Sequence, residues 1–388
     1  MERAFAAVLA FTALIGQAQA ADKVKIGFLS TFSGPSAALA IDIRDGFNLF
    51  VQANGGKLGG VPVEITFGDD QQNPDTAKQL TEKLLKRDRV DFVTGIVFSN
   101  VMLAVAPSIF ESETFLVSAN AGPTAYAGEG CNPWFFAASW QNDGLHEAAG
   151  KYVNEKGFKN VVLVAPNYPA GKDALTGFKR FYKGNVVDEI YPKLAQLDFS
   201  AELAQIRAAK PDALYIFLPG GMGVNFIKQY VAAGLNKQMV LVGPGFSADE
   251  DLIKAVGEPM VGMFNTSQWA HDLDNAANKR FVAEFQKQYQ RMPTLYASQG
   301  YDAAQLLDAA IRDVKGKIED KDAVRKALQA ANFKSVRGDF KLNVNHFPIQ
   351  TYYLRQVVKE PNGRITNKLI GPVLTAHGDA YAGACKMR

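Results

Sequence analysis

The sequence predicts an α/β protein of two doubly wound lobes, each built on a mostly parallel sheet with helices on both faces. Strand-like apolar segments alternate with segments of helical periodicity from residue 23 to residue 242. This series restarts near residue 134, which indicates a second unit of similar size. A chain of 388 residues, 47% of them hydrophobic, also suits two lobes better than one core.

The N-terminus has the composition of a secretory signal peptide. Arg3 precedes an apolar stretch at residues 4–15, and Ala18-Gln19-Ala20 supplies the small residues of a cleavage site. This stretch is shorter than the ~20 residues of a membrane-spanning helix, so an N-terminal anchor is the less favoured alternative. We therefore expect cleavage after Ala20 (signal peptide 1–20) and a soluble periplasmic protein.

The first series predicts alternating strands and helices. In chain order these are a strand at 23–30, a helix at 36–54, a strand at 61–67, a helix at 74–87, a strand at 90–97, a helix at 100–110 and a strand at 114–118. Pro74 suits the first turn of its helix, and Asn73 suits the N-cap before it. Strands separated by helices in this way pair in parallel.

The second series has the same pattern. It predicts strands at 134–139, 160–165, 186–190, 213–218 and 239–242, and helices at 144–156, 173–182, 201–209 and 223–233. The remaining chain predicts an extended segment at 261–268, helices at 276–289, 296–314 and 321–330, and strands at 340–342, 350–356 and 365–369. A Pro361-Asn362-Gly363 turn separates the last two strands.

No long linker separates the two series, so we expect a hinge of three short crossings rather than a flexible tether. The crossings are expected near residues 139–142, 265–270 and 339–341. This assigns residues 21–140 and 270–339 to the first lobe, and residues 141–269 and 340–388 to the second.

Charge, cysteine and histidine content restrict the function. A net charge of +3 without a basic run of five residues gives no indication of a nucleic-acid partner. Cys131 and Cys385 are the only cysteines, and in an oxidising compartment they predict one disulfide, with two separate thiols as the alternative. The four histidines are scattered without ligand spacing, so we expect no metal site.

Motifs of the common enzyme classes are absent from the sequence. There is no GxxxxGK[ST] phosphate loop, no HExxH and no GxSxG. Gly220-Gly221-Met222-Gly223 follows a predicted strand, but Phe226 stands where a dinucleotide fingerprint needs its third glycine. We therefore expect no cofactor and no enzymatic activity, with an amidase- or dehydrogenase-like enzyme as the least favoured alternative.

The segments that follow the predicted strands carry the chemistry of binding. Ligands of doubly wound sheets bind outside the carboxyl ends of the strands. Here those ends are residues 32–36, 98–100, 118–124, 167–169, 219–221 and 244–246. They are rich in hydroxyls, amides and aromatic rings and poor in titratable groups, which favours binding of a small organic molecule over acid–base catalysis.

Several short motifs also occur in a fixed order along the chain. They are Thr31-Phe32-Ser33-Gly34-Pro35, Asp45-Gly46-Phe47, Asn54-Gly55-Gly56, Leu58-Gly59-Gly60, Asp69-Asp70-Gln71-Gln72-Asn73-Pro74, Gly171-Lys172-Asp173 and Tyr301-Asp302-Ala303. Together they resemble the type I periplasmic binding proteins of the branched-chain amino-acid kind, which serve ABC importers. Residues 118–123 and 139–143 are most similar to a subset associated with aromatic carboxylates. The resemblance implies a monomer of the type I fold, a small-molecule ligand in the cleft and a membrane permease as partner.

The resemblance also allows the amino-acid-reading positions of the family to be carried over. Ser99 and Tyr168 match its serine and tyrosine, and Ala121 matches its alanine, but Gly122 replaces its threonine. Gly245 stands where the family has an acid that neutralises a ligand ammonium. Because a buried ammonium without an anionic partner is costly, an amino acid is a poor ligand for this site.

Aromatic side chains take the place of that charge, and stacking on them stabilises a bound ring by roughly 0.5–1.5 kcal/mol beyond area burial. We expect about half of these aromatic side chains to touch the ligand. Arg44 is expected to reach a carboxylate or, as readily, to lie on a solvated helix face. The Ser99 hydroxyl and the backbone N–H groups around Asn120–Gly122 are further predicted carboxylate donors. The predicted site comprises Phe32, Arg44, Phe98, Ser99, Asn120, Ala121, Gly122, Trp140, Tyr168, Phe246 and Trp269.

The sequence thus predicts a binding protein for an aromatic carboxylate such as a benzoate or a phenylpropenoate. Two alternatives remain open from the sequence alone. One is a binding protein for branched-chain or other amino acids, and the other is a sensor that presents its ligand to a receptor.

Overall fold

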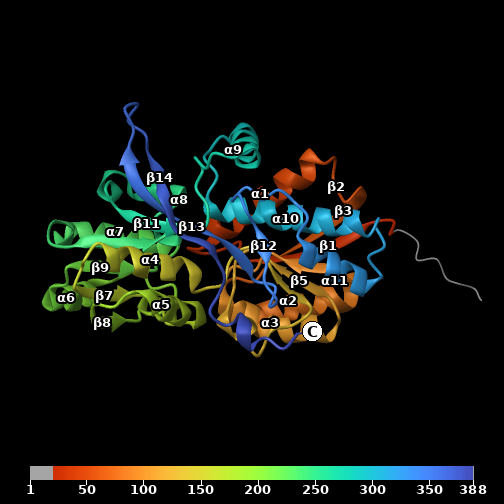
Figure 1. Ribbon diagram of the computed structural model, residues 1–388, viewed down its shortest axis with the longest axis horizontal. Helices are drawn as coiled ribbons and strands as arrows, with labels where there is room; N and C mark the ends of the chain where they lie inside the picture. Colours follow the sequence, from red (N-terminus) through yellow and green to blue (C-terminus); the bar gives the residue numbers. More distant parts are fainter. Residues whose placement is uncertain (1–20, 388) are drawn as a thin grey trace, which may run out of the picture.

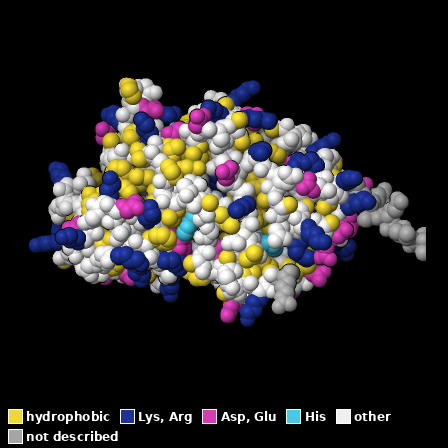
Figure 2. All heavy atoms as spheres, in the orientation of Figure 1, with side chains coloured by type: hydrophobic (Ala, Val, Ile, Leu, Met, Phe, Trp, Pro, Cys, Tyr) yellow, Lys and Arg dark blue, Asp and Glu magenta, His cyan; other side chains and the backbone are white. Residues whose placement is uncertain are grey.

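The computed structural model describes residues 21–387, so the predicted signal peptide lies outside the described residues. Two lobes lie side by side and meet near the middle of the molecule (Figure 1). None of the helices within residues 21–387 is both long and apolar enough to cross a membrane. On the face in Figure 2, basic and acidic side chains are interspersed over both lobes, as the small net charge leads one to expect.

The first lobe is built on a six-stranded sheet. Its strand order is β2 (Lys57–Leu58), β3 (Val61–Asp69), β1 (Val24–Ser30), β4 (Phe92–Thr94), β5 (Phe115–Ser118) and β6 (Phe135–Ala137). All neighbours are parallel except β2 and β3. The helices of this part of the chain are α1 (Ala37–Ala53), α2 (Pro74–Glu82), continued by a π-helical segment to Asp88, and α3 (Ser99–Glu111).

Three later helices complete the first lobe in Figure 1: α9 (Ala276–Tyr289), α10 (Leu295–Asp313) and α11 (Lys321–Ala330). Glycines bring α10 against α1. A β-carbon on Gly46 would stand 1.9 Å from the carbonyl oxygen of Ala297, and one on Gly300 would stand 2.1 Å from that of Ile43. Only glycine allows so close an approach of two helix backbones.

The second lobe has an eight-stranded mixed sheet. Its order is β12 (Lys341–Leu342), β13 (Pro348–Lys359), β11 (Phe264–Ser267), β10 (Val240–Pro244), β9 (Ala213–Ile216), β7 (Asn160–Val164) and β8 (Asn185–Ile190), with β14 (Ile365–His377) paired to β13. The strands from β7 to β11 are parallel, and β13 is antiparallel to its neighbours. The helices are α4 (Gly144–Glu155), α5 (Pro169–Phe181), α6 (Ser200–Ala209), α7 (Gly221–Ala232) and α8 (Glu250–Val256).

The predicted α/β class with two parallel-sheet lobes is confirmed, with local differences. The strand at which the second series was expected to restart is an edge of the first sheet, within the residues 21–140 assigned to the first lobe, because Leu116 of β5 pairs with Phe135 of β6. The β2 strand and α8 were not predicted, since two and seven residues are too short to show a clear period. The β13–β14 hairpin is longer at both strands than its alternation suggested.

The chain passes between the sheets after β6, after β11 and before β12, and the C-terminal tail returns to the first lobe beside α3 (Figure 1). A disulfide joins Cys131 to Cys385, with Cα atoms 5.6 Å apart, so the predicted pairing is confirmed. The tail segment after β14 is thereby attached to the first lobe, although the sequence assigned residues 340–388 to the second.

A buried arginine joins the first and third of these crossings. Arg337 is 1% exposed at its side chain and pairs from Nε with Asp302 Oδ2 at 3.0 Å. Its Nη1 donates to the carbonyl of Ser139 at 2.6 Å and to Gln350 Oε1 at 2.8 Å. Burial lowers the pKa of Arg337, opposed by the charge of Asp302. One guanidinium therefore satisfies backbone carbonyls of the first crossing while it is paired to α10.

Candidate ligand-binding site

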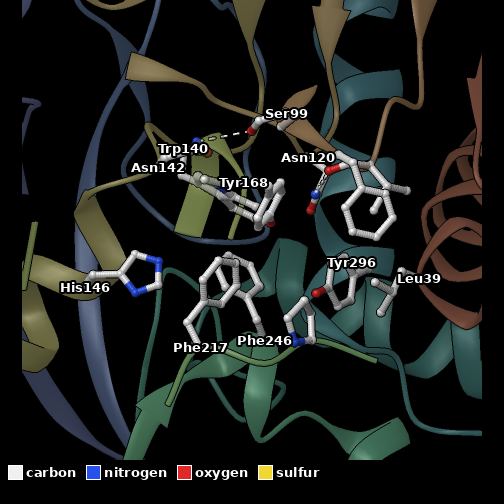
Figure 3. A pocket seen from close by; sticks show the side chains of 15 residues that line it. Leu39, Ser99, Asn120, Trp140, Asn142, His146, Tyr168, Phe217, Phe246 and Tyr296 are labelled. Atoms are coloured by element: carbon white, nitrogen blue, oxygen red, sulfur yellow. Dashed lines mark hydrogen bonds between the residues drawn. The ribbon is translucent and has the colours of Figure 1, made fainter. Parts of the chain in front are cut away.

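A narrow pocket, whose atom-free space is about 390 Å³ when its open side is counted, lies between the lobes (Figure 3). The first lobe lines it from α1, α10, the start of α3 and the loop after β5. The second lobe lines it from α4, the start of α5 and the segments after β9 and β10, and the crossing after β6 closes one side. The lining residues are Leu39, Val97, Phe98, Ser99, Asn120, Ala121, Trp140, Asn142, His146, Tyr168, Ala170, Phe217, Pro219, Phe246 and Tyr296.

The lobes are closed over this pocket. The N–H of Gly221 donates across the cleft to the carbonyl of Pro35 at 3.2 Å. On one side the N–H of Thr124 donates to Asp173 Oδ2 at 3.2 Å, and on another the N–H of Leu295 donates to Asp249 Oδ2. Closure leaves the lining aromatic side chains almost without solvent exposure. A ligand in the pocket would therefore be shielded from water on both lobes.

Aromatic rings form a large part of the pocket wall. Trp140 and Phe246 have ring centroids 4.6 Å apart, and Phe217 lies 5.5 Å from Phe246. Tyr168 is stacked on Phe217 at 6.4 Å and meets Phe98 edge-on at 6.2 Å. Rings in these arrangements pack on one another and turn their free apolar faces and edges to the pocket that they line. The wall therefore suits a planar, largely apolar ligand.

The polar end of the pocket is at the N-terminus of α3. This helix begins at Ser99, and its first N–H groups have no acceptor within the helix, as at every helix N-terminus. The preceding residue, Phe98, offers them no side-chain acceptor either. Ser99 Oγ accepts a hydrogen bond from Asn142 Nδ2 at 3.2 Å, and its own O–H has no acceptor among residues 21–387. Unpaired N–H groups and the positive end of the helix dipole favour an anion at this place.

Asn142 makes hydrogen bonds to groups of both lobes at this end of the pocket. Its Nδ2 donates both to Ser99 Oγ and to Asp173 Oδ2, the latter at 2.8 Å, and its Oδ1 accepts from the N–H of Gly122 at 3.1 Å. Burial raises the pKa of Asp173, opposed by this hydrogen bond from Asn142. The crossing residue Asn142 thus connects α3 of the first lobe with α5 of the second.

The loop after β5 does not offer the backbone donors that the sequence predicted. The N–H of Asn120 donates to Ser118 Oγ, that of Ala121 to the carbonyl of Ile96, and that of Gly122 to Asn142. Each N–H group already donates to an acceptor because the loop packs against its own strand, the segment after β4 and the crossing after β6. Donors to a carboxylate therefore have to come from α3 and from side-chain hydroxyls.

The pocket is electrically neutral. None of the fifteen side chains that line it within the described chain is a carboxylate, lysine or arginine. Burial lowers the pKa of His146 to about 3, so its imidazole is uncharged at neutral pH. Burial also raises the pKa values of Tyr168 and Tyr296 above their usual range, so both hydroxyls stay protonated. An ammonium group would find no charged partner here, and an anion would meet only dipoles and hydroxyls.

Most of the predicted site residues come together in the pocket. Those that line it are Phe98, Ser99, Asn120, Ala121, Trp140, Tyr168 and Phe246. Gly122 lies one layer behind, against the backbone of Trp140. Trp269 is fully buried, donates from Nε1 to Asn278 Oδ1 at 2.7 Å and packs on Phe281, so it belongs to the core of the molecule rather than to the pocket.

Phe32 and Arg44 line a different, open depression on the first lobe, together with Phe67. Arg44 donates from Nη2 to Asp45 Oδ1 at 2.8 Å and lies over the ring of Phe32. Its side chain is partly exposed, and Arg44 is not among the residues that line the pocket. The solvated-face alternative is therefore the one that the structure supports.

Sequence reasoning missed several lining residues. Phe217 follows β9 at a carboxyl strand end, where a search for binding residues could have found it. Leu39, His146 and Tyr296 lie on helices, and no local pattern marks which helical positions face an inter-lobe pocket. They were recognisable only once the lobes were placed against each other.

The comparisons with known proteins agree with this geometry. A family model described as a periplasmic binding protein matches residues 23–363. The chain is 36% identical to the solute-binding protein of an ABC transporter from R. palustris in complex with benzoate, with a TM-score of 0.88 and coverage of 94% of this chain and 100% of the other.

Two further relatives differ in the ligands that their names give. A solute-binding protein from Rhodopseudomonas palustris HaA2 in complex with p-hydroxybenzoic acid is 28% identical, with a TM-score of 0.86 and coverage of 92% and 99%. The Leu/Ile/Val-binding protein homolog 6 of Brucella melitensis biotype 1 is 29% identical over 379 residues, which are 95% of this chain and 96% of that protein.

Proposed function

Since this chain belongs to the periplasmic binding protein family, we propose that it delivers a monocyclic aromatic carboxylate to the membrane permease of an ABC importer. The family assignment supports a non-catalytic solute-binding role. The pocket supports the more specific statement, which is the class of ligand.

The neutral aromatic pocket is the observation that carries the proposal. A planar ring gains from burial against Trp140, Phe217 and Phe246, since burying apolar surface contributes roughly 25 cal/mol per Å². The carboxylate then lies at Ser99, where the free hydroxyl and the first N–H groups of α3 supply donors. Charge-assisted hydrogen bonds of this kind are about twice as strong as neutral ones.

An amino-acid ligand fits the same pocket less well. The name of the Brucella relative refers to leucine, isoleucine and valine, so this alternative has a specific basis. An α-ammonium, however, needs an anionic partner in a buried site, and none of the lining side chains is anionic. The complexes of the Rhodopseudomonas neighbours with benzoate and p-hydroxybenzoic acid favour the aromatic acid.

Lobe closure gives the proposed protein its signal to the permease. The cross-cleft hydrogen bonds, such as that from Gly221 to Pro35, exist only when the lobes are closed. A ligand that contacts both lobes stabilises this form by its differential affinity for it. The permease then distinguishes loaded from empty protein by the closed arrangement of the two lobes.

Isothermal titration calorimetry with benzoate, 4-hydroxybenzoate, leucine and glutamate tests the proposal. We expect micromolar or tighter binding of at least one aromatic acid and no binding of either amino acid. Ser99→Ala should weaken binding of the aromatic acid by about 1–3 kcal/mol, the cost of losing a hydrogen bond to a charged group. Ser33→Ala, at an exposed position, is the matched control. Micromolar binding of leucine without a response to either aromatic acid contradicts the proposal.

A further inference from the structure

His146 brings an imidazole into a mostly aromatic part of the pocket. It lies in the first turn of α4 and is 1% exposed. Its ring meets Phe217 edge-on at 5.0 Å and lies 6.1 Å from Phe246. Figure 3 shows the ring directed into the pocket, apart from Ser99 and with Tyr168 between them in this view. A polar group therefore lies away from the end that receives the carboxylate.

Tyr215 determines which ring nitrogen of His146 carries the proton. The Tyr215 hydroxyl is hydrogen-bonded to Nδ1 and has no other partner among residues 21–387. Because the imidazole is neutral, only one ring nitrogen is protonated. A proton on Nδ1 would leave the buried Tyr215 O–H without an acceptor, which is costly. The arrangement that satisfies both groups has Tyr215 donating to Nδ1 and the proton on Nε2.

The Nε2–H of this tautomer has no acceptor in the described part of the chain, although the residue lines the pocket. We propose that His146 determines specificity by donating from Nε2 to an oxygen substituent on the ligand ring, on the side away from the carboxylate. The ligand class is then an aromatic acid with a hydroxyl or ether oxygen there, such as 4-hydroxybenzoate. This inference rests on the proposed function, because it presupposes an aromatic acid in the pocket.

A series of four acids separates the inference from the function on which it rests. These are benzoate, 4-methylbenzoate, 4-hydroxybenzoate and 4-methoxybenzoate. Calorimetry should show that the two oxygen-bearing acids bind about tenfold more tightly than benzoate, the contribution of one hydrogen bond. The methoxy compound decides the direction of the bond, since it accepts but does not donate. Weak 4-methoxybenzoate beside tight 4-hydroxybenzoate would overturn the assignment of Nε2 as the donor.

His146→Phe is the decisive variant, because it keeps an aromatic ring and removes the Nε2 donor. It also removes the Nδ1 acceptor of the Tyr215 hydroxyl, so some loss of stability is expected and the comparison between the two acids, not the absolute affinity, is the readout. We expect the ratio of the benzoate to the 4-hydroxybenzoate dissociation constant to fall from about ten in the wild type towards one. An equal loss for both acids would overturn the inference and place the carboxylate at His146. A failure of the wild type to bind any of the four acids would instead reject the proposed function.

Tyr215→Phe supplies a second test that leaves His146 in place. Without the Tyr215 hydroxyl, the imidazole is no longer held in one tautomer, so the preference for an oxygen substituent should decrease. Long-range ¹H–¹⁵N NMR of the wild type should show a protonated Nε2 and an unprotonated Nδ1 on His146. A proton on Nδ1 in the wild type would overturn the inference whatever the affinities.

Discussion

Arg355 lies directly against Gly245: a β-carbon built on this glycine would stand 2.8 Å from Nη2 of the arginine. Such a carbon would also stand 2.7 Å from Leu295 Cδ2. Arg355 is 1% exposed and is held by bonds from Nε to Asn265 Oδ1 at 2.8 Å and from Nη1 to the carbonyl of Trp269 at 3.2 Å. Position 245 therefore has no room for a side chain unless buried neighbours move.

Gly245→Ala should lower the free energy of unfolding by about 1–3 kcal/mol, the usual cost of overpacking a buried site. Urea denaturation followed by circular dichroism measures it. Gly371→Ala is the matched control, because no atom lies within 4 Å of its added β-carbon, and it should change stability by less than about 0.5 kcal/mol. Equal stabilities of the two variants would show that the Arg355 side chain moves away from the added β-carbon without a cost in stability.

Gly245→Asp tests whether an acidic side chain at this position could face the ligand. The new carboxylate would start beside Arg355 Nη2, which has no hydrogen-bond partner within the described chain, and would pair with it instead of facing the ligand. We therefore expect no gain of leucine binding in calorimetry. Micromolar leucine binding by this variant would contradict this account of the geometry.

Arg337→Met should destabilise the protein by about 3–5 kcal/mol, because it leaves Asp302 as a buried charge without its partner. The variant also removes the donor to the Ser139 carbonyl in the first crossing. Arg312→Met breaks an exposed i,i+4 pair with Asp308 and should cost less than about 1 kcal/mol. Thermal unfolding of both variants measures the difference, and similar losses would reject a special role for the buried pair.

Asp251 should make stability depend on pH. Burial raises the pKa of Asp251 to about 8, and the negative charges of Asp42 and Asp249 add to this shift. Burial also raises the pKa of Asp42 to about 6 and that of Asp249 to about 7. Arg291 and Arg355 oppose the shifts of Asp42 and Asp249, respectively. The folded state therefore binds more protons than the unfolded chain, and the free energy of unfolding should fall as the pH rises from about 4 to about 8.

Asp251→Asn should raise the free energy of unfolding at pH 8 by on the order of 2 kcal/mol, since it removes a charge that the buried site disfavours. The gain should shrink as the pH is lowered towards 4. Asp22→Asn, at an exposed position, is the control and should show no such trend. Denaturant midpoints at pH 5 and pH 8 give the comparison, and a gain that grows at low pH would contradict the expected direction of the pH dependence.

The disulfide should stabilise the attachment of the C-terminal tail. Tyr381 of this tail donates to Asp143 Oδ2 at 2.8 Å, and a few residues later Cys385 is bonded to Cys131. Replacing both cysteines by serine should cost about 2–5 kcal/mol. Ligand affinity should stay within about twofold, because neither cysteine lines the pocket. An unchanged melting temperature of the double variant would show that the tail is held without the bond.

Local pattern was enough to predict the elements and the fold class. The helices α9 and α11 begin and end where their periodicity predicted, because an amphipathic face repeats every turn and can be read without knowledge of the partner. The pair Cys131–Cys385 was also predictable, since an exported chain with two cysteines has one possible bridge. Residues that follow buried strands, such as Ser99 and Tyr168, were found because parallel strands bring their carboxyl ends to one edge.

The tertiary structure alone decided which of these residues share a pocket. Arg44 and Phe32 lie on an outer face of the first lobe, whereas Leu39 of α1 faces the cleft, and the choice depends on how the second lobe approaches. The same holds for the N–H groups of Asn120–Gly122, which donate to acceptors at the end of β5, after β4 and in the crossing after β6. The sequence determined the elements and their chemistry because these depend on local periodicity. The lobe packing determined the site because hydrogen bonds and burial depend on contacts between distant segments.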